Sequence, residues 1–225
     1  MRRSPNIWDH PHIYELENRS VDPDGVVEAA MAEVRDWAGA SVLDVGCGSG
    51  FHLTALAQRA ARVYGVEPHP PLVDLARRRT AALPNVQVLT GMAQRIPLPD
   101  KSIDVAMARW AYFFGPRCEP GLRELDRLVR RGGAAFVVDV DPTRSAYGAW
   151  FREWKPQYDA VAVQRFWAVH GWSRRTLDLR WSFDNRADLE AVVRIELPPD
   201  IAERALAGQS GLELSYAANL WWRRF

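Results

Sequence analysis

The stretch that decides the fold is residues 42–50, with the sequence VLDVGCGSG. Its first part is an apolar run interrupted only by Asp44, which predicts a buried β-strand, and three glycines follow at every second position. Glycine has no Cβ atom, so it lets a ligand approach the backbone and tolerates a positive φ. Apolar residues at helical spacing predict a helix over residues 51–60. We therefore expect a ligand on a strand–turn–helix loop, facing the first N–H groups of that helix.

The glycine spacing differs from that of dinucleotide-binding proteins. Those proteins use G-x-G-x-x-G and hold a pyrophosphate, whereas Gly46, Gly48 and Gly50 form G-x-G-x-G. Asp44 stands two residues before the first glycine, where its charge would repel a pyrophosphate and suit an ammonium or a sulfonium. The loop therefore favours a cationic nucleoside over NAD, and an NAD-linked oxidoreductase is the less favoured alternative.

A second carboxylate follows the next predicted strand. Residues 62–66 predict that strand, and Glu67 and Pro68 end it, 23 residues after Asp44. A carboxylate at the carboxyl end of a strand can accept hydrogen bonds from both hydroxyls of a ribose, and proline stiffens the turn that aims it.

With these residues the chain resembles the class I S-adenosylmethionine-dependent methyltransferases, in particular their small-molecule, type 11/25-like branch. The resemblance implies an α/β fold with a Rossmann-like sheet of seven strands, the last one antiparallel, helices on both faces and a small helical, aromatic cap. It also implies S-adenosylmethionine as cofactor and S-adenosylhomocysteine as product. The residues expected to hold the methionine end and the ribose are Asp44, Gly46, Cys47, Gly48, Gly50, Glu67 and Pro68.

A third motif, GMAQRIPLPDKSID over residues 91–104, is similar to the family's gly-asp-ala-glu, leu-pro-phe-pro-asp and ser-phe-asp stretch. Where the family has an aspartate that accepts from the adenine amino group, this chain has Met92, which contacts the ring only by packing. The resemblance then implies that backbone groups of Met92 and Ala93 contact the edge of the adenine base, and that the Gln94 side chain compensates for the missing aspartate.

The fourth predicted strand, residues 105–108, ends in Arg109 and Trp110. In the family, cofactor and acceptor meet at this point, so the resemblance makes Arg109 a cofactor contact and Trp110 an acceptor contact. Tyr112 follows in an aromatic run that either lines the acceptor site or belongs to the core. The asn/asp-pro-pro-tyr/phe tetrapeptide of nucleic-acid amino-methyltransferases is absent from this position.

His170 is the first candidate for a general base, because histidine titrates near neutrality and this one ends a predicted cap helix. Tyr112 is the second candidate. Tyr14 and Tyr147 are candidate acceptor contacts, and Tyr14 lies in an N-terminal segment that folds over the cofactor as a lid in similar enzymes. A structural role is the alternative for each of them. No metal ligands are predicted.

We predict a single domain, with an N-terminal lid and leading helix over residues 1–38, a cofactor-binding core over 39–141, and a cap with C-terminal strands over 142–225. Seven of the ten tryptophans fall in residues 150–222, where they either form an aromatic acceptor pocket or pack the cap onto the sheet.

Composition limits the classes of partner that the protein can bind and the cellular compartment in which we expect it. A net charge of +1 argues against a nucleic-acid footprint, and no apolar run is long enough to span a membrane. The two cysteines suggest neither a disulfide nor a metal site, and no signal peptide follows the first arginines, so we expect a cytoplasmic protein. The 27 arginines against 2 lysines are typical of a GC-rich bacterial genome. The sequence does not define an oligomeric state.

The sequence therefore favours methyl transfer from S-adenosylmethionine to the oxygen, nitrogen or carbon of a small, aromatic or apolar metabolite. The alternative is a cofactor-binding, methyltransferase-like protein with a regulatory or non-methylating role, for which Met92 is the only indication.

Overall fold

The computed structural model describes residues 4–225, so the first three residues of the predicted lid lie outside the described part. The chain divides into two compact units. The first contains residues 4–27, Val140–Ala160 and Thr176–Asn219, and the second contains Glu28–Asp139, Val161–Arg175 and Leu220–Phe225. This division differs from the predicted one, because residues 161–175 of the predicted cap belong with the core.

The strands form one mixed sheet. They are β1 (Ser41–Val45), β2 (Arg62–Glu67), β3 (Val86–Thr90), β4 (Ile103–Arg109), β5 (Val129–Val140), β6 (Ser173–Ser182) and β7 (Glu213–Arg224). Their order is β3-β2-β1-β4-β5-β7-β6, and β1 to β5 run parallel to one another. The Gly132 amide donates to Phe225 and the Asp141 amide to Ala217, so β7 runs antiparallel to β5. The predicted seven-stranded sheet is confirmed.

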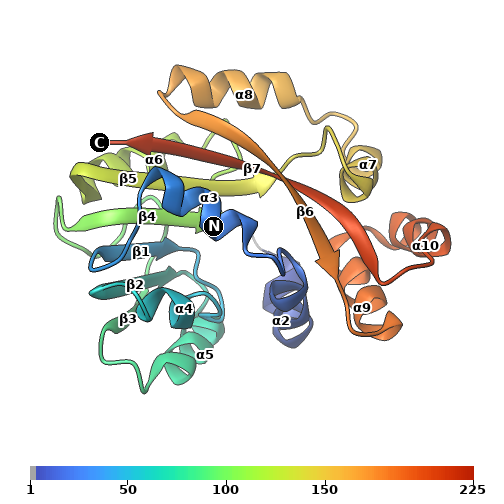
Figure 1. Cartoon of the computed structure of the whole chain (residues 1–225), viewed down its shortest axis with the longest axis horizontal. Helices are drawn as coiled ribbons and strands as arrows, with labels where there is room; N and C mark the ends of the chain where they lie inside the picture. Colours follow the sequence, from blue (N-terminus) through green and yellow to red (C-terminus); the bar gives the residue numbers. More distant parts are fainter. Residues whose placement is uncertain (1–3) are drawn as a thin grey trace. The chain divides into compact units, whose positions relative to one another are not determined.

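The second unit carries the parallel strands and the helices that cover them (Figure 1). The helices are α3 (Val26–Val34), α4 (Leu53–Ala57), α5 (Pro70–Thr80), α6 (Glu119–Leu128) and α8 (Ala160–Val169). Helix α4 packs against β2, and α5 packs against β2 and β3. Because parallel strands are covered on both faces, their central residues, such as Leu43 and Val105, are fully buried.

One boundary differs from the sequence-based prediction. Helix α4 is shorter than residues 51–60, because the glycine turn continues through Phe51 and His52. Strand β5 begins at Val129, directly after α6, because Val129 already pairs with Ile103 of β4.

Residues 161–175 join the second unit through tryptophan packing. Trp167 on α8 stacks on Trp221, with ring centroids 5.5 Å apart, and meets Trp172 edge-on at 4.9 Å. All three rings are at least 95% buried. For Trp167, Trp172 and Trp221, the alternative of packing onto the sheet therefore holds, rather than that of an acceptor pocket.

The first unit is mainly helical. Its helices are α1 (Pro5–Asp9), α2 (Pro11–Ser20), α7 (Ala146–Trp154), α9 (Arg186–Glu196) and α10 (Pro199–Gly208). Helices α2 and α10 both pack against α9. The Tyr147 ring lies 5.0 Å from those of Trp181 and Tyr216 and 6.4 Å from that of Trp150. These aromatic side chains therefore form the core of this unit.

A pair of buried carboxyls joins four helices of the first unit. Glu196, the last residue of α9, accepts a hydrogen bond from Asn6 Nδ2 of α1 at 2.6 Å and from the Tyr147 hydroxyl of α7 at 3.4 Å. Glu17 of α2 hydrogen-bonds to the same carboxyl group. Burial raises the pKa of both carboxyls, and the neighbouring Glu196 raises that of Glu17 further. Both carboxyls therefore bind a proton more readily in the folded chain than in the unfolded one.

Stability should fall with rising pH because of this pair. Folding raises both pKa values, so the folded state binds more protons than the unfolded one, and stability is lost as pH rises from 4.5 through the raised values. Glu17→Gln, which keeps a hydrogen-bond donor, should flatten this decline in urea unfolding measured at several pH values. The exposed-site control Asp184→Asn should keep the wild-type slope. An unchanged slope in Glu17→Gln would contradict a raised pKa at Glu17.

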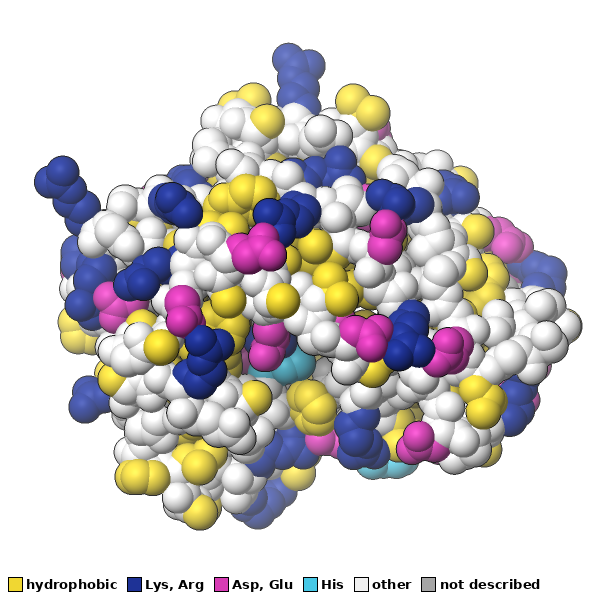
Figure 2. Space-filling model, viewed as in Figure 1, with side chains coloured by type: hydrophobic (Ala, Val, Ile, Leu, Met, Phe, Trp, Pro, Cys, Tyr) yellow, Lys and Arg dark blue, Asp and Glu magenta, His cyan; other side chains and the backbone are white. Residues whose placement is uncertain are grey.

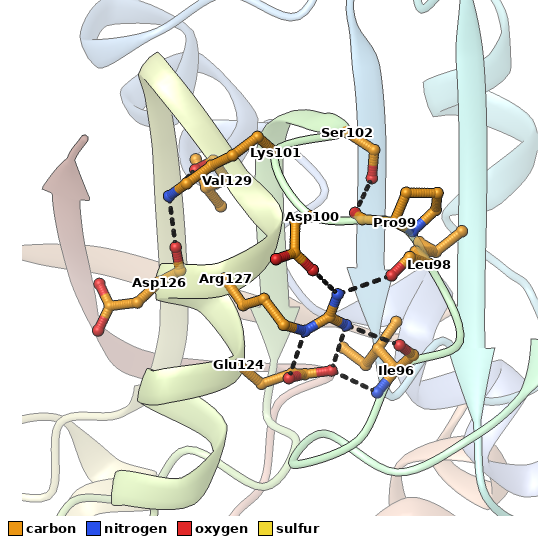
Figure 3. A network of polar contacts seen from close by, with 10 residues as sticks. All are labelled: Ile96, Leu98, Pro99, Asp100, Lys101, Ser102, Glu124, Asp126, Arg127 and Val129. Atoms are coloured by element: carbon orange, nitrogen blue, oxygen red, sulfur yellow. Dashed lines mark hydrogen bonds and ion pairs between the residues drawn. The ribbon is translucent and has the colours of Figure 1, made fainter.

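The loop between β3 and β4 is fastened by one arginine (Figure 3). The Arg127 guanidinium of α6 donates to the carbonyl oxygens of Ile96 and Leu98 at 2.9 and 2.8 Å and pairs with Asp100 at 2.6 Å. It also pairs with Glu124, whose carboxylate accepts from the Ile96 amide at 2.7 Å. Two side chains of α6 thus satisfy the backbone of a loop that has no regular structure of its own.

Arg127→Ala should lower the free energy of unfolding by about 2–3 kcal/mol, because it leaves Glu124 and two carbonyl groups without their donor. Urea unfolding measures this change. The control is Arg123→Ala on the exposed face of the same helix, which should change the free energy by less than about 0.5 kcal/mol. Equal effects of the two substitutions would contradict a role for the network.

Candidate cofactor site

The glycine loop is held against the second strand. The amides of Gly46 and Cys47 both donate to the Val66 carbonyl, at 2.8 and 3.1 Å. All three glycines have positive φ. A Cβ atom on Gly46 would lie 2.5 Å from the Ala111 Cβ, so the loop after β4 approaches this glycine too closely for any side chain.

Glu67 links the glycine loop to the end of β2. Its Oε2 accepts from the Gly48 amide at 3.2 Å and its Oε1 from the His69 amide at 3.0 Å, which closes the turn through Pro68. Burial raises its pKa, and these two hydrogen bonds oppose the rise. Because each carboxylate oxygen carries two lone pairs, both oxygens retain capacity to accept from a ligand.

Asp44 and Arg109 place opposite charges beside this loop. Asp44 is 97% buried, which raises its pKa to about 6, and the Arg109 charge acts in the opposite direction. The Arg109 side chain is 93% buried, and its Nη2 lies 3.2 Å from Glu28 Oε1 of α3. Asp44 and Arg109, each predicted as a cofactor contact, therefore lie close enough within the second unit for their charges to interact.

His52 is the residue that sequence reasoning missed. Its Nδ1 lies 2.9 Å from Arg109 Nη1, and because arginine only donates hydrogen bonds, Nδ1 must accept and the ring proton must reside on Nε2. Burial, with the charges of Arg109 and Arg79, holds the pKa of His52 well below its usual value. The one available signal was its position, two residues after the last glycine of the loop.

The turn over residues 91–94 adjoins the same strand end. The Gly91 amide donates to the Glu67 carbonyl at 3.2 Å, and the Arg95 amide donates to that of Met92 at 2.8 Å. Met92 is 40% exposed and Ala93 is buried. The Gln94 side chain is exposed. The structure thus brings the start of the predicted adenine turn to the backbone of Glu67, the residue predicted to hold the ribose.

Residues Trp110 and Tyr112 follow β4 with positive φ values of 48° and 53°. Side chains other than glycine disfavour this region, and such strain is common at functional sites. The Trp110 amide donates to the Val138 carbonyl at 2.8 Å, and Ala111 between them contacts Gly46. The Tyr112 ring packs against Gly121 in the first turn of α6. The backbone of this segment adjoins the glycine loop, while the Tyr112 ring lies against α6.

The structure does not bring His170 to the glycine loop. Its carbonyl accepts from Arg223, which also pairs with Asp126 at the end of α6. Phe225 exchanges hydrogen bonds with Gly132 and Gly133, near the start of β5. His170 therefore lies at the edge where the parallel strands begin, whereas the glycine loop follows their ends. Its Nδ1 also faces the Phe166 carbonyl at 2.8 Å.

Tyr14 and Tyr147 belong to the first unit, whereas every predicted cofactor residue belongs to the second. Tyr147 is 95% buried, and burial with the nearby Glu196 raises its pKa well above the usual value.

Burial also raises the pKa of the Cys47 thiol, and it raises that of the Cys118 thiol to about 12. Neither cysteine is therefore a thiolate near neutral pH.

Comparison with known proteins identifies the core. Residues 43–137 match the family described as "Methyltransferase domain". This part of the chain is therefore similar to methyltransferase domains. An uncharacterized methyltransferase of Mycobacterium bovis is 36% identical to the chain over 127 residues, which cover 54% of this chain and 49% of the relative. The chain thus spans about half the length of that relative.

Solved structures agree on the fold. The YcgJ protein of Bacillus subtilis superposes with a TM-score of 0.64 at 18% identity, over 90% of this chain and 99% of that one. Geranyl diphosphate C-methyltransferase of Streptomyces coelicolor, solved with Mg²⁺, geranyl diphosphate and S-adenosylhomocysteine, gives 0.58 at 16% identity, over 87% and 76% of the two chains. At these identities the likeness establishes the fold of the methyltransferase domain.

Within residues 4–225, no helix is both long and apolar enough to cross a membrane. The same residues contain no group of three or more His, Cys, Asp or Glu side chains arranged to hold a metal ion. The expectations of a cytoplasmic location and of no metal stay predictions.

The close approach at Gly46 can be tested against a second glycine with the same backbone conformation. Gly39 has φ +68° and open space around its missing Cβ, so Gly39→Ala should cost only the backbone strain, about 1–2 kcal/mol. Gly46→Ala adds the collision with Ala111 and should cost about 1–3 kcal/mol more in urea unfolding. Equal costs would show that the loop after β4 moves away freely.

Proposed function

We propose that this protein is an S-adenosylmethionine-dependent methyltransferase that methylates a small-molecule acceptor. The observation that carries the proposal is Glu67, whose carboxylate contacts the glycine loop and the end of β2 at once. A carboxylate placed there, with acceptor capacity left on both oxygens, suits two ribose hydroxyls. The family match over residues 43–137 supports the same cofactor.

The residues present fit this cofactor. Gly46 and Gly48 have no side chains, so the loop backbone is open to the cofactor. Glu67 accepts hydrogen bonds from the ribose hydroxyls, and the backbone groups of Met92 and Ala93 contact the base. Asp44 supplies a negative charge that suits a cationic ligand. The bound cofactor supplies an activated methyl group on a sulfonium. The protein then contributes the orientation of the acceptor and the exclusion of water.

The acceptor is a small, aromatic or apolar metabolite that is methylated on oxygen, nitrogen or carbon. The aromatic run that begins at Trp110 includes Ala111, which contacts Gly46 of the glycine loop, and this supports the choice. Tyr14 stays a proposed acceptor contact and Tyr112 the proposed base, whereas Tyr147 is left out of the proposal because its ring is buried in the core of the first unit. His170 is no longer a candidate in the proposal, because it lies at the opposite edge of the sheet.

We propose no nucleic-acid and no membrane partner. Figure 2 shows Lys and Arg side chains interspersed with Asp and Glu on the face in view, which supports this choice because phosphate backbones are bound by extended basic surfaces. A cytoplasmic location fits the proposed small-molecule chemistry.

A cofactor-binding protein without methyl transfer is the second candidate, supported by the exposure of Met92 where an adenine contact is expected. Incubating the protein with S-adenosylmethionine and a panel of phenols and amines separates the two, because only an enzyme forms S-adenosylhomocysteine together with a methylated product.

Calorimetry tests the cofactor itself. Wild-type protein should bind S-adenosylhomocysteine with a dissociation constant in the micromolar range and should not bind NAD. Glu67→Gln should weaken binding by about 1.5–3 kcal/mol, because a charge-assisted contact to the ribose is lost. The control Asp74→Asn changes an exposed acid on α5 and should bind as wild type does. Absence of binding to folded wild-type protein would overturn the proposal.

A further inference from the structure

Arg109 has hydrogen-bond donors that the protein leaves unused. A guanidinium carries five N–H groups. Nη1 donates to His52, and Nη2 donates to Glu28 and contacts the Met107 sulfur at 3.5 Å. The Nε–H is buried and has no acceptor among residues 4–225. A buried charged donor without an acceptor costs free energy, so this atom indicates that a ligand supplies the missing oxygen.

His52 presents a second donor beside the first. His52 Nδ1 accepts the hydrogen bond from Arg109, so the ring proton resides on Nε2 and the ring is neutral. In this state His52 cannot take a proton through Nδ1, and its Nε2–H can only donate. Arg109 therefore sets the chemical character of His52.

Both side chains belong to segments that border the glycine loop. His52 follows Gly50 by two residues, and Arg109 ends β4 just before Ala111, which contacts Gly46. The acids Asp44 and Glu28 balance the Arg109 charge, so the pair offers donors without an excess of positive charge. This combination suits a carbonyl oxygen or the carboxylate of a zwitterion better than a phosphate dianion.

We propose that Arg109 and His52 together bind a carboxylate or carbonyl oxygen of a ligand held at the glycine loop, with Arg109 locking His52 as the neutral Nε2–H donor. The inference rests on the proposed function, since the ligand is either the amino-acid end of the cofactor or the acceptor. Asp44 of β1, Glu28 of α3 and Arg79 of α5 are the other charged groups that act on this pair.

The tautomer is read by nitrogen NMR of His52 in the full chain. Wild-type His52 should show a protonated Nε2 and a bare Nδ1, without titrating near its ordinary pKa of about 6.5. Arg109→Gln removes the charge, so His52 should titrate closer to that ordinary value. A wild-type ring protonated on Nδ1, or one that titrates normally, would overturn the proposal.

The ligand oxygen is identified with three probes. S-adenosylhomocysteine has an amino-acid end, methylthioadenosine lacks it, and acetate supplies a free carboxylate to the methylthioadenosine complex. A shift of the His52 Nε2–H signal with S-adenosylhomocysteine but not with methylthioadenosine assigns the oxygen to the cofactor. A shift only after acetate is added assigns it to the acceptor. No shift with any probe, when both nucleosides bind, refutes the inference alone; failure of both nucleosides to bind refutes the proposed function.

Substitutions at His52 give the matching affinities. With the oxygen on the cofactor, His52→Phe should weaken S-adenosylhomocysteine about tenfold and leave methylthioadenosine unchanged, because one hydrogen bond is lost. His52→Gln should restore most of the affinity, because its amide oxygen accepts from Arg109 and its NH₂ donates in place of Nε2–H. Equal weakening of both nucleosides by His52→Phe would indicate a structural role and would contradict the assignment.

Discussion

The carboxylate of Glu67 is the contact on which the site depends. It accepts one hydrogen bond from a backbone amide of the glycine loop and one from an amide of the turn after β2. It therefore holds together two segments that each lie outside regular secondary structure. Burial disfavours its charge, and the two amides offset that cost by hydrogen bonding. A ligand that donates to the same oxygens meets a carboxylate that is already oriented.

Two other loops of the second unit are held by the same means. Arg127 and Glu124 of α6 satisfy the backbone of the loop before β4, and the Val138 carbonyl of β5 anchors Trp110 after β4. In each case a helix side chain or a strand carbonyl supplies the partner that the loop cannot supply for itself. Loops placed in this way keep their geometry without regular structure, which suits them for binding.

Buried ionisable groups in the two units serve different purposes. In the second unit, the Arg109 charge lowers the pKa of Asp44, and the buried Arg109 Nε has no hydrogen-bond partner among the described residues. In the first unit, Glu17 and Glu196 have raised pKa values and connect four helices. The first arrangement supports recognition, and the second links the helical packing to pH.

The sequence by itself determined the parallel sheet, the glycine loop and the carboxylate at Glu67. These follow from local signals: apolar runs, glycines two residues apart, and an acid one strand–helix–strand step further on.

Only the tertiary structure decided which distant side chains meet. His52 and Arg109 lie 57 residues apart in the chain, and no local sequence pattern predicts that their side chains are in contact. The residue type of His170 suits a base, but the direction of the chain places it at the edge where the parallel strands begin, near the end of α6 and the start of β5. Residue type and spacing predict local backbone structure, whereas strand direction and long-range packing decide which side chains share a site.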